Sequence, residues 1–542
     1  MSLLTGLATQ NEITAPNIEY AQLAPILIVF GAAILGVLIE AFLPRPARRV
    51  AHLVVAITAL LAALLVIVGI PGWFEGLRGT QHVAAVGALG IDGPGLFLQG
   101  LILALSLVAV LLAAERGTDG EEPFVAQAAA VPGSPAERAA SRAGTTQTEV
   151  FPLMLFAVGG MLMFVVANDL ITMFVALEVL SLPLYLLCGL ARRRRLLSQE
   201  AAMKYFLLGA FSSAFFAYGI ALLYGYAGTV RLSGIADAVS GHCDSIAIGG
   251  QCETVLAAGQ NDALLLIGMA LLGVGLLFKI GAVPFHVWKP DVYQGAPTPI
   301  TGFMAAATTV AAFGALVRVF YVAFFDMRWD WRPAMWAVAV LSMLVGAIVA
   351  ITQTDMKRML AYSSIAHAGF ILTGLIATNR AGLSATLFYL AAYGFVTIGA
   401  FAVITLVRDA GGEATHLSRW AGLGKSSPVV AAIFALFLLA FAGIPLTSGF
   451  TAKYNVFLAA VDGGATPLVV IGLVSSAIAA FFYVRVIVLM FFSEPPATAP
   501  VVAFPSVLTV VAVTIGLAVT VFLGVYPQPV LELANGIGPF VR

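Results

Sequence analysis

The stretch LLFKIGAVPFHVWKPDVYQGAP, residues 276–297, places a lysine beside a glycine and a proline at the end of an apolar run. The residues before Lys279, 263–278, are all uncharged. An apolar run of about 20 residues is typical of a helix that crosses a membrane. Proline removes a backbone donor and frees a carbonyl group in the preceding turn. We therefore expect this helix to break at Gly281 and Pro284, directly beside its lysine.

A second stretch, LAFAGIPLTSGFTAKYNVF at 439–457, carries the same features in reverse order, because Gly443 and Pro445 precede Lys453. A straight helix from Val429 to Lys453 would be about 36 Å long, and the hydrocarbon core of a membrane is only about 30 Å thick. Apolar residues still follow the lysine. We expect this helix to break as well.

Broken helices at corresponding places in two halves of a chain indicate an ion pathway built on inverted repeats. The two prolines are 161 residues apart, which fits two repeats of five helices each. We expect these repeats at 150–323 and 334–491. A three-helix segment at 1–114 and a cytoplasmic linker at 115–149 would precede them, and a C-terminal helix and tail at 504–542 would follow.

The composition agrees with a membrane protein over the whole length. Of 542 residues, 61% are hydrophobic and 10% are charged, with a mean hydropathy of +1.01, whereas soluble chains have about 25% charged residues. The expected fold class is an all-α polytopic membrane protein with about 14 transmembrane helices. The spans are expected near 21–43, 51–70, 95–114, 150–167, 169–190, 201–227, 263–288, 299–323, 334–352, 355–376, 383–407, 429–461, 466–491 and 504–525.

Charge and cysteine content exclude several functions. The 27 Lys and Arg residues balance 27 Asp and Glu residues, so no basic excess is available to bind nucleic acid. Three cysteines cannot supply a four-thiolate zinc or iron–sulfur site, and CxxC, HExxH and P-loop motifs are absent from the sequence. We expect neither cofactor nor metal in this chain. Cys243 and Cys252, on the expected external side, fit a disulfide and two free thiols equally well.

The loops differ in their content of positive charge. Alternate loops contain 16 Lys and Arg residues on one side and 6 on the other. The richer set includes the run Arg192 to Arg195, together with Lys289 and Lys357. Positive charge accumulates on the cytoplasmic side of membrane proteins. We therefore expect both termini on the external side.

Ionisable groups at membrane depth are costly and are functional candidates for that reason. Glu178 lies near the middle of its apolar helix, which favours a functional role over a structural one. Lys204 lies at the start of the next span. Its position fits a lysine whose side chain extends to the membrane surface, and it fits equally well a lysine at the depth of Glu178. His367 lies deep in its span beside hydroxyl residues 362–364, which fits a core histidine or a hydrated path. Arg318 fits a pairing or interfacial residue better than a proton carrier.

Five stretches are similar to the antiporter-like proton-translocating subunits of respiratory complex I, the proton-pumping NADH-quinone oxidoreductase. The similarity covers about residues 20–525, and AYSSIAHAGF and PFHVWKPDVYQGAPTP favour subunit N over subunits L and M. The stretches are FVALEVLSLPLYLLCGL, EAAMKYFLLGAFSSAFFAYGIALLYG, LLFKIGAVPFHVWKPDVYQGAPTP, KRMLAYSSIAHAGF and LAFAGIPLTSGFTAKYNVF.

The resemblance implies a proton-translocating subunit in the membrane arm of a bacterial inner-membrane complex, driven by quinone reduction elsewhere. Glu178 matches the key glutamate of the family, Lys204 its paired lysine, Lys279 the central lysine and Lys453 the exit-side lysine, with His367 as a further candidate for the relay. The implied partners are the lipid bilayer, the antiporter-like subunit M and small subunits such as K and J. FMN, iron–sulfur clusters and quinone are expected in partner subunits.

One position departs from the family pattern. The family commonly has a lysine in its eighth span, where this chain reads GFMAAATTVAAFGALVRVF with Thr309 at the aligned place. A hydroxyl and water could carry that step, Arg318 or His367 could take it over, or the link between the two halves could differ.

Two other functions fit the same set of helices. The chain could be a membrane subunit of a multisubunit cation/proton antiporter or of a membrane-bound hydrogenase, and the identity of co-purifying proteins separates these from complex I. It could also be a structural scaffold of the membrane arm. Neutralising its buried charges would then impair assembly, whereas a pump would assemble and lose transport.

Overall fold

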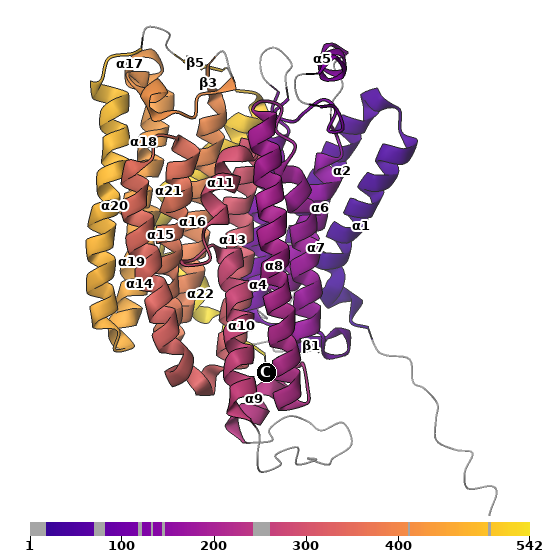
Figure 1. Cartoon of the computed structure of the whole chain (residues 1–542), viewed down its shortest axis with the longest axis vertical. Coiled ribbons are helices and arrows are strands. Elements are labelled where there is room, and N and C mark those ends of the chain that lie inside the picture. The colour runs from indigo at the N-terminus through magenta and orange to yellow at the C-terminus, as the bar shows by residue number, and fades with distance from the viewer. Residues whose placement is uncertain are drawn as a thin grey trace, which may run out of the picture.

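The computed structural model describes residues 18–69, 82–116, 122–131, 134–143, 147–241, 261–409, 412–496, 500–503 and 505–541. The pair Cys243 and Cys252 lies outside these residues, so the disulfide stays a prediction. The described chain is a bundle of long helices that run side by side (Figure 1). Twelve helices in it are long and apolar enough to cross a membrane, and two shorter apolar helices complete the expected fourteen spans. The predicted all-α membrane fold is therefore confirmed.

The bounds of the helices follow the sequence closely. Polar residues that suit a helix start occupy many N-terminal caps: Asp92, Asp169, Asp355 and Asn379 each accept a hydrogen bond from a backbone N–H in the first turn. The bundle helices are α1 (Tyr20–Phe42), α2 (Arg45–Gly69), α4 (Gly93–Ala113), α6 (Val150–Phe164), α7 (Leu170–Cys188), α8 (Arg195–Ala227), α10 (Asp262–Ile280), α12 (Thr298–Phe303), α13 (Thr309–Val322), α14 (Arg328–Thr352), α15 (Met356–Ile376), α16 (Arg380–Leu406), α18 (Pro428–Ala442), α19 (Ser448–Asp462), α20 (Thr466–Phe492) and α21 (Val507–Val525).

Short elements cover the two ends of the bundle. The end that carries α5, α17 and β3 is called the basic end here, because the Arg-rich loops lie there (Figure 1). The opposite end carries α9, β1 and the described C-terminal residues. The short helices are α5 (Pro135–Arg142), α9 (Leu232–Ser240), α11 (Trp288–Gly295), α17 (Leu423–Ser426) and α22 (Gln528–Gly536). The strands are β1 (His82–Ala84) paired with β2 (Leu89–Ile91), and β3 (Val407–Asp409) between β4 (Gly412–Glu413) and β5 (Val501–Val502), all antiparallel.

Two spans are broken, as the sequence predicts. α10 ends at Ile280 and α11 begins at Trp288, whereas α18 ends at Ala442 and α19 begins at Ser448. Gly281 and Gly443 follow the two helix ends directly, with φ of +75° and +82°. This left-handed backbone suits glycine, which has no Cβ to clash. Pro284 and Pro445 lie within the two non-helical connections, so neither half-helix can continue through them.

The span from Thr298 to Val322 contains an irregular turn. Residues Met304–Thr308 form a π-helix between α12 and α13, and Thr309 is the first residue of α13. A π-helical turn inside an α-helix frequently marks a functional position. The residue that departs from the family pattern therefore follows directly after a local distortion of its helix.

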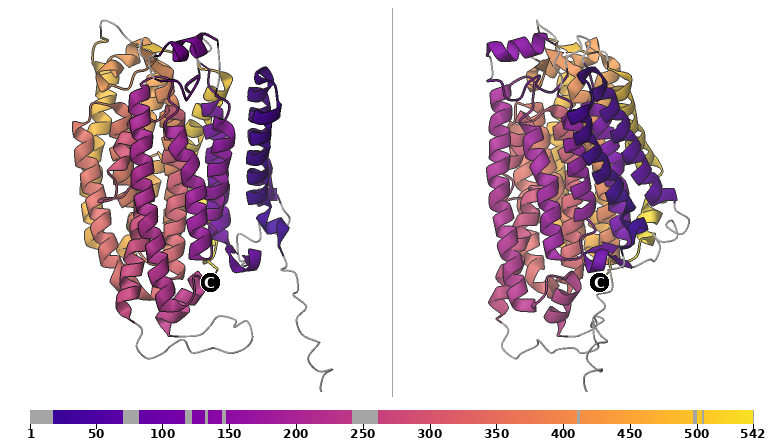
Figure 2. Two further views of the ribbon diagram at one scale, coloured as in Figure 1. Left: turned by 45° about the vertical axis from the view of Figure 1, so that its right-hand side comes forward. Right: turned by 90° about the vertical axis from the view of Figure 1, so that its right-hand side faces the viewer.

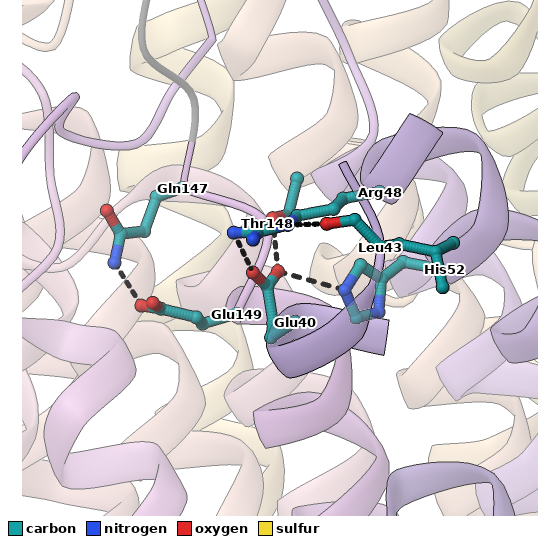
Figure 3. A network of polar contacts seen from close by, with 7 residues as sticks. All are labelled: Glu40, Leu43, Arg48, His52, Gln147, Thr148 and Glu149. Atoms are coloured by element: carbon teal, nitrogen blue, oxygen red, sulfur yellow. Dashed lines mark hydrogen bonds and ion pairs between the residues drawn. The ribbon is translucent and has the colours of Figure 1, made fainter. Parts of the chain in front are cut away.

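The N-terminal hairpin of α1 and α2 stands at one edge of the bundle (Figure 2). A polar network at its basic end ties it to the segment before α6 (Figure 3). The Glu40 carboxylate lies 3.0 Å from Arg48 Nη1 and 2.9 Å from His52 Nε2. The Thr148 hydroxyl donates to the same carboxylate. One carboxylate therefore joins α1 and α2 to the segment before α6, which is distant in sequence.

A buried ion pair joins segments at the opposite end. Asp92 and Arg318 are both 0% exposed and lie 2.8 Å apart. Arg318 Nε donates to the Val165 carbonyl at 2.8 Å, and the Val541 amide donates to Asp92 at 3.0 Å. Arg318 is thus a pairing residue, and the pair joins α4, α13 and the C-terminal segment.

Loss of this pair should destabilise the subunit. In Asp92→Asn, the Arg318 guanidinium stays buried without its counter-charge, which costs about 3 kcal/mol or more. We expect a lower thermal midpoint for the purified complex in mild detergent. Asp409→Asn is the matched control, because its Arg419 partner lies 3.6 Å away and both side chains are partly exposed; it should change stability by about 1 kcal/mol or less. Equal midpoints for the two variants would contradict this account.

Candidate functional site

The first buried lysine lies at the break between α10 and α11. Lys279 is 5% exposed and is the second-last residue of α10. Its ammonium donates to Ser181 Oγ at 2.7 Å and to Tyr205 Oη at 3.2 Å. It also lies 5.3 Å from the centre of the Tyr205 ring and 5.9 Å from that of Tyr185. Helices α7 and α8 therefore supply its whole polar shell.

Glu178 lies on α7, one turn before Ser181. One oxygen of its carboxylate is buried and has no hydrogen-bond partner in the described part of the chain. Glu178 is the carboxylate that interacts electrostatically with Lys279. A buried carboxylate oxygen without a hydrogen bond is costly, so its retention favours a functional role.

Lys204 makes its ion pairs in this structure with carboxylates other than Glu178. Its ammonium lies 2.7 Å from Asp291 Oδ2 and 2.7 Å from Glu200 Oε1. Glu200 lies one turn earlier on α8, and Asp291 approaches from α11, so both carboxylates are closer to the lysine than Glu178 is. Its side chain is 42% exposed, unlike that of Lys279. The structure thus holds Lys204 away from the glutamate that the resemblance assigns to it.

Asp291 is a site residue that the sequence interpretation missed. Besides Lys204, it accepts a hydrogen bond from Arg358 Nη1 at 2.5 Å, so it links α8, α11 and α15. A signal for it existed, because an acid follows directly after a proline in the broken segment WKPDVY.

Lys289 is a second site residue that the sequence interpretation missed, and it does not belong among the exposed loop cations. The sequence interpretation placed it among the cytoplasmic loop cations, but it is 1% exposed. Its ammonium donates to the Ile280 carbonyl at 2.9 Å and lies 5.6 Å from the centre of the Tyr293 ring. The break explains this position, because Ile280 ends α10 and its carbonyl has no partner within the helix. A Cβ at Gly281 would lie 2.7 Å from Cδ of Lys289.

The second break repeats this arrangement. Lys453 is 5% exposed, and its ammonium donates to the carbonyls of Phe441 and Ala442, each at 3.0 Å, and to Ser476 Oγ at 2.9 Å. The negative end of a helix dipole favours a cation at this place. A Cβ at Gly443 would lie 3.0 Å from Cδ of Lys453. In both breaks, therefore, a left-handed glycine makes room for a lysine that binds the freed carbonyls.

His367 lies between the two lysine sites on α15 and is 3% exposed. Its Nδ1 lies 2.8 Å from Tyr389 Oη, and its Nε2 lies 3.4 Å from Tyr483 Oη. It interacts electrostatically with both Lys289 and Lys453. Both ring nitrogens thus have hydroxyl neighbours.

Thr309 is 5% exposed and belongs to one buried group of side chains with Tyr293, Ser364 and Tyr393. The Tyr393 ring lies 5.0 Å from the ring of His367. Lysine, tyrosine, threonine and histidine groups thus form a row from the first break toward the second, which we call the polar axis. Its members are Lys279, Lys289, Tyr293, Thr309, Ser364, Tyr393, His367, Tyr389, Tyr483 and Lys453.

Several buried polar atoms have no hydrogen-bond partner among the residues that the structure describes. They include side-chain oxygens of Glu178, Thr308, Ser364, Thr397 and Ser475. Buried polar groups normally have a partner, and water often supplies it. Within the ranges that the structure describes, no group of three or more His, Cys, Asp or Glu side chains is placed to hold a metal ion.

A membrane bundle with a buried lysine at each of two broken helices has the features of an ion-translocating protein of the antiporter-like class. The chain belongs to the NADH:quinone oxidoreductase/Mrp antiporter transmembrane family, whose model matches residues 167–479. It is 63% identical to the NADH-quinone oxidoreductase subunit N of Rhodococcus opacus (strain B4), over 99% of each chain.

Two solved structures agree with this assignment. Respiratory complex I from Thermus thermophilus with bound aureothin contains a chain that is 32% identical with a TM-score of 0.72, over 94% of this chain and 99% of that one. The Mrp complex from Dietzia sp. DQ12-45-1b contains a chain with a TM-score of 0.77 and 22% identity, over 95% and 96% of the two chains, which shows a shared fold. The protein is accordingly an antiporter-like, proton-translocating membrane subunit of NADH-quinone oxidoreductase of the subunit N type.

Thr309 can be tested directly. If its hydroxyl keeps the polar axis hydrated, Thr309→Val should reduce proton pumping several-fold in membrane vesicles, whereas Thr309→Lys should be tolerated because it restores the family's lysine. Thr373→Val is the matched control, because the Thr373 hydroxyl donates to the Gly369 carbonyl of its own helix at 3.1 Å. Normal pumping by Thr309→Val would mean that the Thr309 hydroxyl, like that of Thr373, only bonds a carbonyl of its own helix and takes no part in conduction. Failure of an assembled Thr309→Lys complex would show a path rebuilt around a neutral residue.

Proposed function

We propose that protons cross the membrane along the polar axis, from Lys279 at the first break through His367 to Lys453 at the second. Glu178 and Lys204 act as the charge switch that controls Lys279. The observation that carries this proposal is the repeated geometry of the two breaks, each with a buried lysine bonded to carbonyls or hydroxyls, joined by buried hydroxyl and imidazole groups.

The state of Lys204 supports a specific switch. With Lys204 held by Asp291 and Glu200, the Glu178 carboxylate is free to stabilise the Lys279 ammonium. If Lys204 moved to Glu178, that stabilisation would be lost and Lys279 would release its proton along the axis. Asp291 would then be left with Arg358 as its partner.

The attraction energy of one ion pair is similar to the energy needed to move one proton across the membrane. Two unit charges about 4 Å apart attract by about 4 kcal/mol at an effective dielectric constant of about 20. Moving one proton against about 150 mV costs about 3.5 kcal/mol. Making or breaking one ion pair can therefore drive one transfer step.

The division of the chain follows from this scheme. The repeats at 150–323 and 334–491 each contain one broken helix and form the two half-paths. The described helices of the segments 1–114 and 504–542, α1, α2, α4 and α21, pack against helices of the repeats. The segment 115–149 is assigned as the linker. In this scheme the two repeats have inverted orientations with respect to each other.

The surroundings of the subunit are also part of the proposal. The basic end faces the cytoplasm of a bacterial cell, and both termini are external, as the Lys and Arg bias predicts. Membrane subunits M, K and J are the neighbours, and FMN, iron–sulfur clusters and quinone belong to partner subunits. A purely scaffolding role is the alternative, and the experiment below separates the two.

Glu178→Gln keeps the size and hydrogen-bonding capacity of the side chain but removes its charge. We expect an assembled complex with proton pumping reduced about tenfold or more and with slower coupled quinone reduction. Combining it with Lys204→Met should cost less than the sum of the single changes, because the two residues act as one switch. Glu532→Gln is the control, since Glu532 is exposed on α22 and belongs to neither lysine site. Full pumping by Glu178→Gln would contradict the proposed switch. Loss of assembly without a separate loss of pumping would favour the scaffolding role.

A further inference from the structure

A cavity of about 80 Å³ lies at the basic end, where the turn between α11 and α12 meets β3 and β4. Its lining includes Arg194, Arg408, Glu122, Glu413 and Lys357. Most of these residues belong to loops or strands, but Lys357 is the second residue of α15 and is only 3% exposed. The cavity therefore brings aqueous loops into contact with a buried lysine that the scheme above does not use.

A continuous set of hydrogen bonds joins this lysine to an acid in the cavity wall. Lys357 Nζ donates to the Ala296 carbonyl at 2.7 Å and to Thr298 Oγ1 at 3.1 Å. The Thr298 hydroxyl donates in turn to the Glu413 carboxylate. Each neighbouring pair in the series Glu413, Thr298, Lys357 is thus within direct proton-transfer distance.

The contacts of Lys357 also lead toward the polar axis. The Ala296 carbonyl that accepts from Lys357 lies three residues after Tyr293. The Thr301 hydroxyl lies 3.2 Å from the Tyr293 carbonyl and 3.5 Å from the Ala296 carbonyl. Lys357 therefore lies between the cavity and the turn that follows Tyr293.

We propose that Glu413, Thr298 and Lys357 form an inlet through which protons from the basic-end cavity reach the polar axis. This inference rests on the proposed function, because an inlet has meaning only if the axis carries protons. Lys357 and Glu413 are the proton-carrying groups of the inlet, and Thr298 passes the proton between them.

The transfer balances in three steps. Lys357 first gives its proton to a group of the polar axis and becomes a neutral amine. The Glu413 carboxylate then takes a proton from hydronium in the cavity and leaves water. The Thr298 hydroxyl finally gives its proton to the amine while the Glu413 acid returns one to the Thr298 oxygen and becomes a carboxylate again. One proton has entered, and all three side chains have regained their starting forms.

The alternative is that Lys357 only holds the α11–α12 turn in place through its bond to the Ala296 carbonyl. Arginine distinguishes the two, because Lys357→Arg keeps the charge and the donors but cannot release a proton under physiological conditions. For the intact complex in membrane vesicles, we expect Lys357→Arg to assemble and to lose proton pumping about tenfold or more. Pumping at the parental level in Lys357→Arg would overturn the inlet.

A second variant covers the case in which arginine prevents assembly. In Glu413→Gln, the amide oxygen still accepts the Thr298 hydroxyl, but the side chain no longer carries a proton. We expect the same loss of pumping per NADH oxidised. Glu122→Gln is the matched control, because this carboxylate lines the same cavity but pairs with Arg49 and Arg116; it should pump normally.

These outcomes are separable from failure of the polar axis itself. If Lys279→Met loses pumping while Glu413→Gln pumps normally, the axis stands and the inlet is wrong. If Lys279→Met pumps normally, the polar axis does not carry protons, and the proposed function is wrong whatever the result for the inlet. If Glu122→Gln and Glu413→Gln lose pumping equally, the cavity acts through its overall charge and not through this relay, which also contradicts the inlet.

Discussion

The structure depends on one constraint, which is that a helix broken inside a membrane leaves backbone carbonyls that need partners. Hydrocarbon offers none, so the protein must supply them. Here Ile280, Phe441 and Ala442 end their half-helices, and the ammonium groups of Lys289 and Lys453 bind the freed carbonyls. The same breaks that would destabilise the bundle thus create two sites that hold a positive charge at membrane depth.

Function follows from what surrounds these sites. A lysine satisfied by carbonyls and hydroxyls alone can lose its proton without leaving a buried anion behind. The anions come from Glu178, one turn before the Ser181 that bonds Lys279, and from Asp291, which pairs directly with Lys204. In this structure Lys204 pairs with Asp291 and Glu200 and not with Glu178, which is one of the two charge arrangements that the proposed switch requires.

The sequence was informative where a charge interrupts an apolar run. Lys279, Lys453 and Glu178 stand out for that reason, and glycine and proline mark the two breaks. Lys289 and Lys357 were missed because they lie next to prolines, aspartates and arginines, so they resemble loop cations. Only packing shows that both are buried. Asp291 was missed as the partner of Lys204 because the two residues are 87 positions apart and meet only when α11 packs against α8.

The most direct test of the account measures protons pumped per NADH oxidised by the reconstituted complex with Lys279→Met, a change that keeps the length of the side chain but cannot hold a proton. Lys425→Met is the control, because Lys425 is an exposed cation in the last turn of α17. The account predicts an assembled complex with a lower ratio for Lys279→Met and an unchanged ratio for Lys425→Met. An unchanged ratio for Lys279→Met would contradict it.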